Sequence, residues 1–272
     1  MIIQETPNPG KILIDCMTCG TMFEIDDYRN ELIADTVRKC YERFRKCDPC
    51  RTAEQQARQQ QHIRERKAQI NAQLPELLET AGIPHNYSHD RDTNLIFTQP
   101  PCRYAAEWIY RNRFRNLLIS GETAAGKSTS ACFVAALMIK EEKKIAYTNL
   151  RQLLSNWKSA KTSDRDAVTE RMLRDIFHLD LFIIDEVVGK AKVSESGQEL
   201  LFEILEAVNS GACRAKIWLL GNFYTGSIEE IFYDPEPVRR RLQENFTCVL
   251  LNRSEQTVTP ISVWKGAAHD EE

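Results

Sequence analysis

The sequence predicts an α/β protein in which a parallel sheet is covered by helices on both faces, with a small cysteine-bearing region ahead of it. Two observations predict the sheet: short apolar runs alternate with helical patterns, and each run is apolar almost throughout instead of at every second position. The third observation is a pair of Cys-x2-Cys motifs within the first 50 residues, which predicts a separate metal-binding region.

The apolar runs and the helical stretches between them set the expected order of elements in the α/β domain. Strand–helix alternation of this kind is typical of a parallel sheet that is buried on both faces. The expected strands cover 116–120, 144–149, 181–185, 216–221 and 247–251, and the expected helices cover about 127–141, 150–178, 196–210 and 225–245.

The first 50 residues carry four cysteines at the spacing of a structural zinc site. Cys16, Cys19, Cys47 and Cys50 form two Cys-x2-Cys knuckles with 27 residues between them, which fits a closed tetrahedral Zn²⁺ site. A region this short, with few large apolar residues, needs a cross-link such as a bound metal in order to fold. Free thiols and a redox pair are the alternatives, and Cys40 is a spare thiol that could replace a ligand.

The segment after these cysteines is expected to be a solvated connecting helix over 51–80. It lacks Gly and is rich in Gln, Arg, Ala and Glu, and its apolar positions are sparse until Ile70, so only its end is expected to pack. A turn-rich stretch follows. The expected division is a zinc-binding domain at 1–50, a helical linker at 51–101, the α/β domain at 102–256 and a C-terminal tail at 257–272.

Composition and charge narrow the class of protein. The formal net charge of -3 provides no global basic field, so nucleic acid would have to bind at a local patch. No apolar run reaches the ~20 residues needed to cross a bilayer, and the N-terminus lacks the features of a secretory signal. We therefore expect a cytoplasmic protein with no membrane partner.

The expected strand at 116–120 runs directly into a phosphate-binding loop. The pattern is Gly-x4-Gly-Lys-Ser, and a helical pattern follows it, which is the context that this motif requires. Lys127 is expected to reach the β- and γ-phosphates of ATP, and the Ser128 hydroxyl to ligate Mg²⁺. The alternative is a chance Gly-Lys-Ser loop. The expected nucleotide-binding residues are Gly121, Glu122, Thr123, Ala124, Ala125, Gly126, Lys127, Ser128 and Thr129.

Two later strands end in polar residues that suit ATP hydrolysis. Asp185 is expected in the Mg²⁺ shell, and Glu186 is the candidate general base that deprotonates the attacking water. Asn222 follows the strand at 216–221 and is a candidate sensor of the γ-phosphate. The alternatives are an acidic cap on a buried strand for the carboxylates, and a turn-forming residue for the asparagine.

Three consecutive arginines at 239–241 lie on a short helix that begins with Pro-Glu-Pro. On one helix they point in three directions, so they cannot share one contact. One of them is a candidate arginine finger, which stabilises the transferring phosphoryl group in a neighbouring subunit and therefore requires an oligomer. A solvated basic face is the alternative, and it applies to at least two of the three.

With these motifs in this order, the chain resembles AAA+ ATPases, and among them the DnaC/DnaI-like replicative helicase loaders of bacteria and phages. The resemblance extends over roughly 75–255 and includes the segment 77–84, Leu-Leu-Glu-Thr-Ala-Gly-Ile-Pro, which is similar to the "aGIP" segment of those loaders. It implies an AAA+ domain without a C-terminal lid. It also implies that Arg241 is the finger, that Asn222 is the sensor, and that Asn149 occupies a polar switch position.

The resemblance also implies partners: a replicative DNA helicase, single-stranded DNA, and further copies of this chain in an oligomer. Two alternatives remain, an IstB-type transposition regulator that binds duplex DNA and a transposase, and a small-molecule kinase, against which Glu186 argues. The candidate DNA contacts are basic residues of 151–178, although interleaved acidic residues also suit a solvated face: Arg151, Lys158, Lys161, Arg165, Arg171 and Arg174.

Overall fold

A computed structural model of the chain describes residues 3–5, 11–26, 46–84, 100–158, 165–187, 194–223, 232–252 and 257–260. The chain divides into two compact units, Met1–Gln69 and Ile70–Glu272. The second unit therefore begins well before residue 102, where the α/β domain was expected to start. Cys40, the spare thiol, lies outside the described residues, as does Lys161. No helix in the described ranges is long and apolar enough to cross a membrane.

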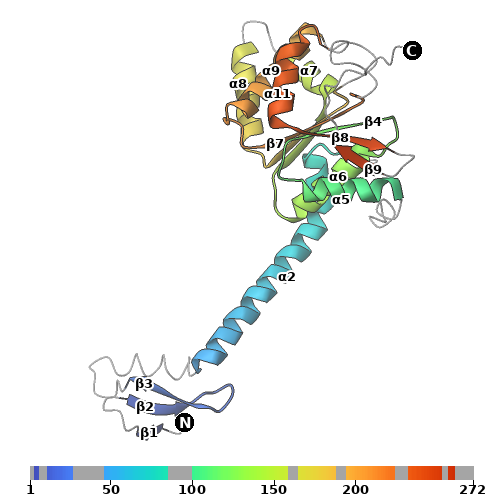
Figure 1. Ribbon diagram of the computed structural model, residues 1–272. Coiled ribbons are helices and arrows are strands. Elements are labelled where there is room, and N and C mark those ends of the chain that lie inside the picture. Colours follow the sequence, from blue (N-terminus) through green and yellow to red (C-terminus); the bar gives the residue numbers. More distant parts are fainter. Residues whose placement is uncertain are drawn as a thin grey trace. The chain divides into compact units, whose positions relative to one another are not determined.

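The larger sheet contains the five expected strands, and all five run parallel (Figure 1). The strand order is β5-β6-β7-β4-β8-β9. The parallel strands are β4 (Leu117–Gly121), β5 (Ile145–Asn149), β6 (Leu181–Asp185), β7 (Lys216–Gly221) and β8 (Thr247–Asn252).

The sixth strand of this sheet lies at the start of the stretch from residue 257 that was expected as a tail. Strand β9 (Thr257–Pro260) pairs antiparallel with β8, with Val258 opposite Leu251. The run is short and β-branched, and it finds backbone partners at an otherwise open sheet edge. The sheet is therefore mostly parallel, with one antiparallel edge strand.

Helices cover both faces of the sheet, as expected. One face packs against α5 (Pro100–Arg111) and α6 (Lys127–Lys140). The other face packs against α7 (Leu150–Lys158), α8 (Arg165–Phe177), α9 (Glu195–Asn209) and α11 (Pro235–Asn245). The last of these helices begins at Pro235, a residue well suited to the first turn of a helix, and residues 225–231 of the expected helix 225–245 lie outside the described part.

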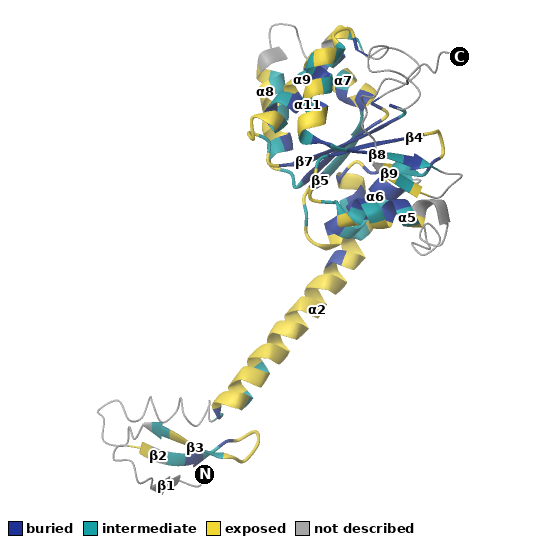
Figure 2. Ribbon diagram, in the orientation of Figure 1, coloured by how far each residue is buried: buried dark blue, intermediate teal, exposed yellow. Residues whose placement is uncertain are grey.

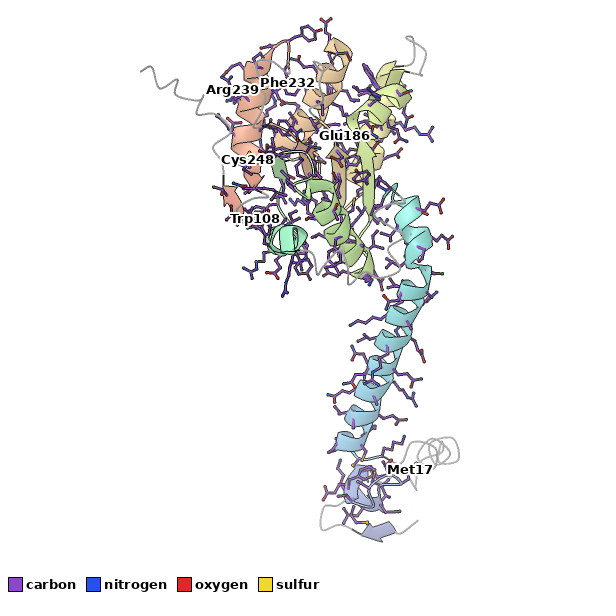
Figure 3. All side chains as sticks on the ribbon, turned by 90° about the vertical axis from the view of Figure 1, so that its right-hand side faces the viewer. Met17, Trp108, Glu186, Phe232, Arg239 and Cys248 are labelled. Atoms are coloured by element: carbon purple, nitrogen blue, oxygen red, sulfur yellow. The ribbon has the colours of Figure 1, made fainter. Side chains whose placement is uncertain are left out.

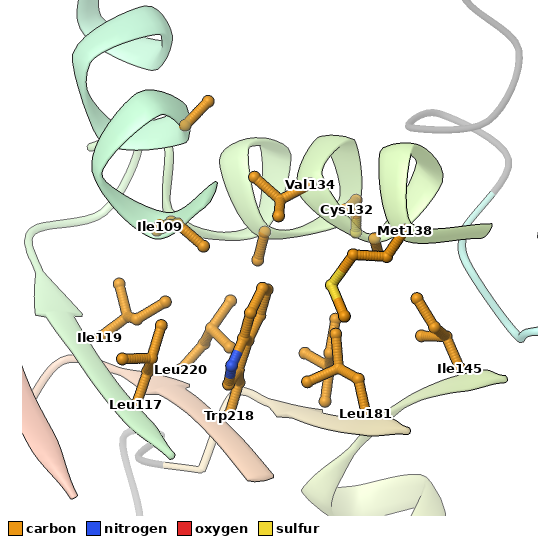
Figure 4. Packing of buried hydrophobic residues seen from close by; sticks show 14 of the residues in the cluster. Ile109, Leu117, Ile119, Cys132, Val134, Met138, Ile145, Leu181, Trp218 and Leu220 are labelled. Carbon is orange, nitrogen blue, oxygen red and sulfur yellow. The ribbon is translucent and has the colours of Figure 1, made fainter. Parts of the chain in front are cut away.

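The core beneath α6 is built around Trp218 on the central strand β7. Its ring is fully buried and faces Leu117 and Leu220 of the sheet and Met138 of α6 (Figure 4). The indole Nε1 donates a hydrogen bond to the Arg115 carbonyl oxygen at 3.1 Å, so its one polar atom is satisfied. This packing holds α6, and hence the loop before it, against the carboxyl edge of the sheet.

The connecting helix is present as α2 (Asp48–Thr80), and most of its length is exposed (Figure 2). Its buried residues, Ile70 and Leu78, lie toward its C-terminal end, as expected, while Cys50 in its first turn belongs to the cluster of four cysteines. In the first unit, β1 (Ile3–Glu5), β2 (Lys11–Asp15) and β3 (Met22–Asp26) form an antiparallel sheet that was not expected from the sequence pattern.

Candidate active site and metal centre

Three neighbouring strands bring Lys127, Glu186 and Asn222, three of the predicted catalytic residues, to one edge of the sheet. Strand β7 lies between β4 and β6, so the residues that follow β7 are placed between the phosphate loop and Asp185. Ser120 is opposite Gly221 in this register, which puts Asn222 next to the start of the loop. Carboxyl ends of parallel strands are where α/β proteins bind ligands.

The two glycines of the loop have conformations that other residues adopt only with strain. Gly126 has φ 87 and immediately precedes α6, and Gly121 has φ 152. A Cβ on Gly121 would lie 2.7 Å from the Leu251 carbonyl oxygen, so a side chain does not fit there. Gly126 brings no side chain to the N-terminus of α6, which leaves the positive end of the helix open to an anion.

Ala124, between these glycines, also adopts a left-handed conformation, with φ 64. For a residue with a Cβ this costs roughly 1–2 kcal/mol. The tip of the loop, residues 122–124, is exposed, whereas Ala125 is fully buried and anchors the loop against the core. The loop therefore carries local strain at its tip.

Lys127 joins the loop to the asparagine that was predicted as a sensor. Its Nζ donates hydrogen bonds to the Gly121 carbonyl at 2.7 Å, to the Glu122 carbonyl at 2.8 Å and to Asn222 Oδ1 at 2.9 Å. Burial lowers the pKa of Lys127, and the negative charge of Asp185 opposes that shift. The structure thus brings Lys127, Asn222 and Asp185 together, while their catalytic roles stay predictions.

Asp185 is buried, and both of its oxygens accept hydrogen bonds. Oδ2 accepts from the Tyr147 hydroxyl at 2.6 Å, and Oδ1 accepts from the Glu186 backbone N–H at 2.7 Å. Glu186 has φ 52, and its side chain is exposed at the end of β6 (Figure 3). An exposed carboxylate at this position can take a proton from a water molecule.

Tyr147 is a residue that sequence reasoning missed. It lies on β5 opposite Ile183, and Asn149 lies opposite Asp185, so Tyr147 and Asp185 belong to the same face of the sheet. The signal in the sequence is a tyrosine two positions before the end of an expected strand. It becomes informative only when the pairing of that strand with β6 is known.

The oxygen atoms near the loop suit magnesium. A serine hydroxyl and a carboxylate, from Ser128 and Asp185, are ligands of the kind that Mg²⁺ prefers when it also binds phosphates. Asp185 lies close enough to α6 for its charge to act on the pKa of Lys127. The residues present therefore fit the metal that ATP carries.

No two of the three late arginines share one of the partners described here. Arg241 donates to a Glu206 carboxylate of α9 and to the Pro237 carbonyl at 3.1 Å, and it stacks over the Phe202 ring at 4.2 Å from the centroid. Arg239 pairs with Glu236 at 3.0 Å. Arg240 pairs with Glu244 at 3.0 Å. The residue expected as the finger is thus bound to its own subunit.

Two further expectations concern residues on and after β5. Asn149 Oδ1 accepts a hydrogen bond from the Gln152 backbone N–H at 2.7 Å, so its side chain caps the first turn of α7. Of the basic residues proposed for DNA contact, Arg151, Arg171 and Arg174 are exposed. An Arg174 guanidinium nitrogen lies 3.9 Å from a Glu170 carboxylate oxygen, as expected for a solvated face on which basic and acidic residues alternate. The side chains of Lys158 and Arg165 are outside the described part.

The four N-terminal cysteines converge on one point. The Sγ atoms of Cys16, Cys19, Cys47 and Cys50 all lie within 4.8 Å of one another, and those of Cys19 and Cys47 are 3.7 Å apart. Four sulfurs bound tetrahedrally at the usual Zn–S distance of about 2.3 Å are separated by roughly 3.8 Å. The cluster therefore has the donor chemistry and the size of a structural zinc site.

Backbone hydrogen bonds fix the conformation of the first Cys-x2-Cys knuckle. The Gly20 N–H donates to the Cys16 carbonyl at 2.8 Å, and Gly20 has φ 72, which closes the tight turn. The Cys47 N–H donates to Cys16 Sγ at 3.4 Å. Burial raises the pKa of the Cys16 thiol, but hydrogen bonds from neighbouring backbone N–H groups outweigh it and lower the pKa to about 6.

A sequence model of the family described as "IstB-like ATP binding protein" matches residues 42–216, more than half of the chain. "Putative insertion sequence ATP-binding protein y4pL" of Sinorhizobium fredii (strain NBRC 101917 / NGR234) is 30% identical over 100 residues, which are 37% of this chain and 38% of that protein. The crystal structure of the DnaC helicase loader aligns with TM-score 0.42 and 12% identity, over 54% of this chain and 86% of that one. DnaI aligns with TM-score 0.41 and 15% identity, over 60% and 87%.

Proposed function

Since the chain belongs to the family of IstB-like ATP binding proteins, we propose that it is an ATPase that loads a hexameric replicative helicase onto single-stranded DNA. The observation that supports ATP hydrolysis is that Lys127, Asp185 and Asn222 lie close together at the carboxyl edge of β4, β6 and β7. The loader part is supported by the sequence resemblance, including the segment 77–84 that leads into the ATPase unit.

The roles at the site follow from the chemistry of each side chain. The N–H groups at the start of α6 and the Lys127 ammonium bind the phosphates, while Ser128 and Asp185 hold magnesium. When bound, magnesium neutralises charge that develops on the phosphates. Glu186 accepts a proton from the attacking water, and Asn222 orients that water or the γ-phosphate.

The site is proposed to be completed by an arginine of a neighbouring subunit. A finger must be free to leave its own subunit, and Arg241 is held by Glu206 and Phe202 with a side chain only 19% exposed. Arg240 is 74% exposed, and its ion pair within the described residues is with Glu244, four residues along the same helix. Because such exposed pairs contribute little to stability, Arg240 can exchange its partner easily.

Two substitutions separate these arginines. Arg240→Ala is expected to reduce ATP hydrolysis at protein concentrations that support the oligomer, while nucleotide affinity stays unchanged. Arg241→Ala is expected mainly to lower the free energy of unfolding, by about 1–2 kcal/mol, because it removes a charge-assisted hydrogen bond and a ring contact. If folded Arg241→Ala lost ATP hydrolysis and Arg240→Ala did not, the arginine finger would be Arg241 instead of Arg240.

The N-terminal cysteine unit is proposed as the part that binds the partner protein. It is compact in its own right, and the residues proposed for the nucleotide site all lie in the second unit. Small zinc-stapled modules present a fixed surface without a large core of their own. In a loader, that surface would bind the helicase.

A transposition regulator is the second candidate, and the curated relative favours it, because that protein is named as an insertion sequence ATP-binding protein. Such a regulator would use the same ATP site but would bind duplex DNA and a transposase. The two candidates therefore differ in partner and in DNA type, and agree on the chemistry of the site.

One experiment distinguishes them. The purified chain is mixed with its cognate hexameric replicative helicase, ATP and single-stranded DNA, and complexes are isolated by pull-down. Affinity for single-stranded and duplex DNA is measured in parallel by fluorescence anisotropy. A loader retains the helicase and prefers single strands, and Lys127→Ala abolishes the ATP dependence. Tight duplex binding without helicase retention would favour the transposition regulator and contradict the loader.

A further inference from the structure

Tyr147 connects the end of helix α2 to the carboxylate proposed to hold magnesium. Its backbone N–H donates to the Ala81 carbonyl at 2.7 Å, and its hydroxyl donates to Asp185 Oδ2 at 2.6 Å. One residue on β5 is therefore in contact with both the segment that leads into the ATPase unit and the active site. All of these atoms belong to the second unit.

The turn at the end of α2 is well defined. The Gly82 N–H donates to the Glu79 carbonyl at 2.9 Å, and the Ile83 N–H donates to the Leu78 carbonyl at 3.0 Å, with Gly82 at φ 76. This is the Schellman arrangement that ends many helices, and its apolar partners Leu78 and Ile83 are both buried in the same cluster. The Ala81 carbonyl therefore has a defined position.

The turn also lies directly against the backbone of β5. A Cβ on Gly82 would come within 2.5 Å of the Tyr147 carbonyl oxygen, a distance that real Cβ atoms do not reach. Any side chain at this position must displace the turn, the strand or both. The absence of a side chain at Gly82 is thus part of what places Tyr147.

At the other end of this connection, two donors orient Asp185. The Tyr147 hydroxyl binds one carboxylate oxygen, and the Glu186 N–H binds the other. An ionised carboxylate has about four lone-pair sites, so each oxygen retains capacity for a further ligand. Hydrogen-bond partners of this kind hold the ligands of a metal in position.

We propose that Tyr147 is a positioning residue that orients Asp185 for magnesium, and that the Ala81–Gly82 turn sets the place of Tyr147. The proposal rests on the proposed function, in which Asp185 holds the metal. A change in how the end of α2 packs against β5 then alters the affinity of the nucleotide site for magnesium. The ATPase unit is in this way sensitive to the helix that leads into it.

The first test removes only the hydroxyl, with Tyr147→Phe. Affinity for Mn²⁺, which reports on the magnesium site, is measured by electron paramagnetic resonance with a non-hydrolysable ATP analogue bound. We expect about tenfold weaker metal binding, since a hydrogen bond to a charged group is lost, with unchanged nucleotide affinity in EDTA. The matched control is Tyr104→Phe, which removes a hydroxyl bonded to the Asn252 carbonyl at 2.8 Å. Metal affinity equal to that of the control would overturn the proposal.

An Asp185→Asn variant separates this inference from the proposed function. If Asp185→Asn loses metal affinity and Tyr147→Phe does not, the positioning role of Tyr147 is wrong while the magnesium site stands. If Asp185→Asn binds Mn²⁺ as the unaltered chain does, the magnesium role itself is wrong. Thermal unfolding of each variant shows whether the ATPase unit is folded in the assay.

The second test concerns the turn, with Gly82→Ala. Its control is Gly211→Ala, because Gly211 has φ 74 but nothing within 4 Å of an added Cβ, so both changes add the same backbone strain and only one adds a clash. We expect Gly82→Ala alone to weaken Mn²⁺ binding, and the double variant with Tyr147→Phe to be no weaker than Tyr147→Phe. Equal metal affinity of the two glycine variants, or fully additive losses in the double variant, would contradict the coupling.

Discussion

Each of the two units of this chain is stabilised in a different way. In the described part of the first unit, the buried apolar residues are Ile14, Cys16 and Cys47, two of which are candidate metal ligands. The second unit has a core on each face of its sheet, with residues such as Trp218 and Leu118 fully buried. A unit of the first kind depends on its ligand to fold, whereas one of the second kind depends on side-chain burial.

The same contrast appears at the glycines that shape the two sites. Gly20, in the cysteine knuckle, has φ 72 and open space around an added Cβ. Gly121, in the phosphate loop, would place a Cβ 2.7 Å from the Leu251 carbonyl. One site constrains only backbone conformation, while the other is also packed against a neighbouring strand.

The largest expected effect follows from removal of the zinc proposed for the four-cysteine cluster. A strong chelator, or Cys16→Ser, is expected to unfold the first unit, because its described core is too small to persist alone. ATP binding is expected to be retained, since the second unit has its own core. The measurements are zinc content, expected near one ion per chain, and nucleotide affinity before and after chelation.

Two outcomes would contradict this contrast between the units. Full zinc content in Cys16→Ser would exclude that residue as a ligand. A first unit that unfolds at the same temperature with and without chelator would mean that it does not depend on a metal. Cys213→Ser is the matched control, because Cys213 lies outside the cluster, in the ATPase unit.

The next effect distinguishes the two glycines. Gly121→Ala is expected to destabilise the second unit by about 3 kcal/mol or more, since backbone must move to relieve the contact, and to impair nucleotide binding. Gly20→Ala is expected to cost the first unit about 1 kcal/mol, from backbone strain alone. Denaturant unfolding of each variant measures both values. Equal losses in the free energy of unfolding would show that the close packing of Gly121 against Leu251 does not add to the cost of the substitution.

The smallest expected effect concerns Ala124. Its left-handed conformation suggests that Ala124→Gly relieves strain, but glycine also makes the unfolded chain more flexible. The net change in the free energy of unfolding is expected to be a gain of less than about 1 kcal/mol. Denaturant unfolding is the measurement, and a clear loss of stability would show that the alanine is not strained in solution.

Much of the second unit could be predicted because its signals are local. The strands are continuous apolar runs, and the phosphate loop is a short motif with a fixed context, so β4, β6, β7 and the residues at their ends follow from the sequence. Strand β9 was missed because four residues at a sheet edge carry too little pattern to separate them from a tail. In the first unit, β1 has three residues, and β2 and β3 have five residues each but mix charged with apolar residues, so none of them is a continuous apolar run.

Contacts between distant elements could not be predicted in the same way. The hydrogen bond from Tyr147 to Asp185 depends on the register between β5 and β6, and that of Tyr147 with Ala81 depends on how α2 ends. The contact of Arg241 with Glu206 depends on the packing of α11 on α9. Such contacts decide which of several candidate side chains is available for catalysis, and residue type alone does not reveal them.

The most direct test of the proposed chemistry is the rate of ATP hydrolysis by Glu186→Gln. The exposed carboxylate at the end of β6 is proposed to be the general base, while Lys127 and the loop bind the nucleotide. The variant is expected to bind ATP with unchanged affinity and to hydrolyse it at least about 100-fold more slowly, as expected when a general base is lost. Hydrolysis at the rate of the unaltered chain, with ATP binding intact, would contradict the assignment of this edge as a hydrolytic site.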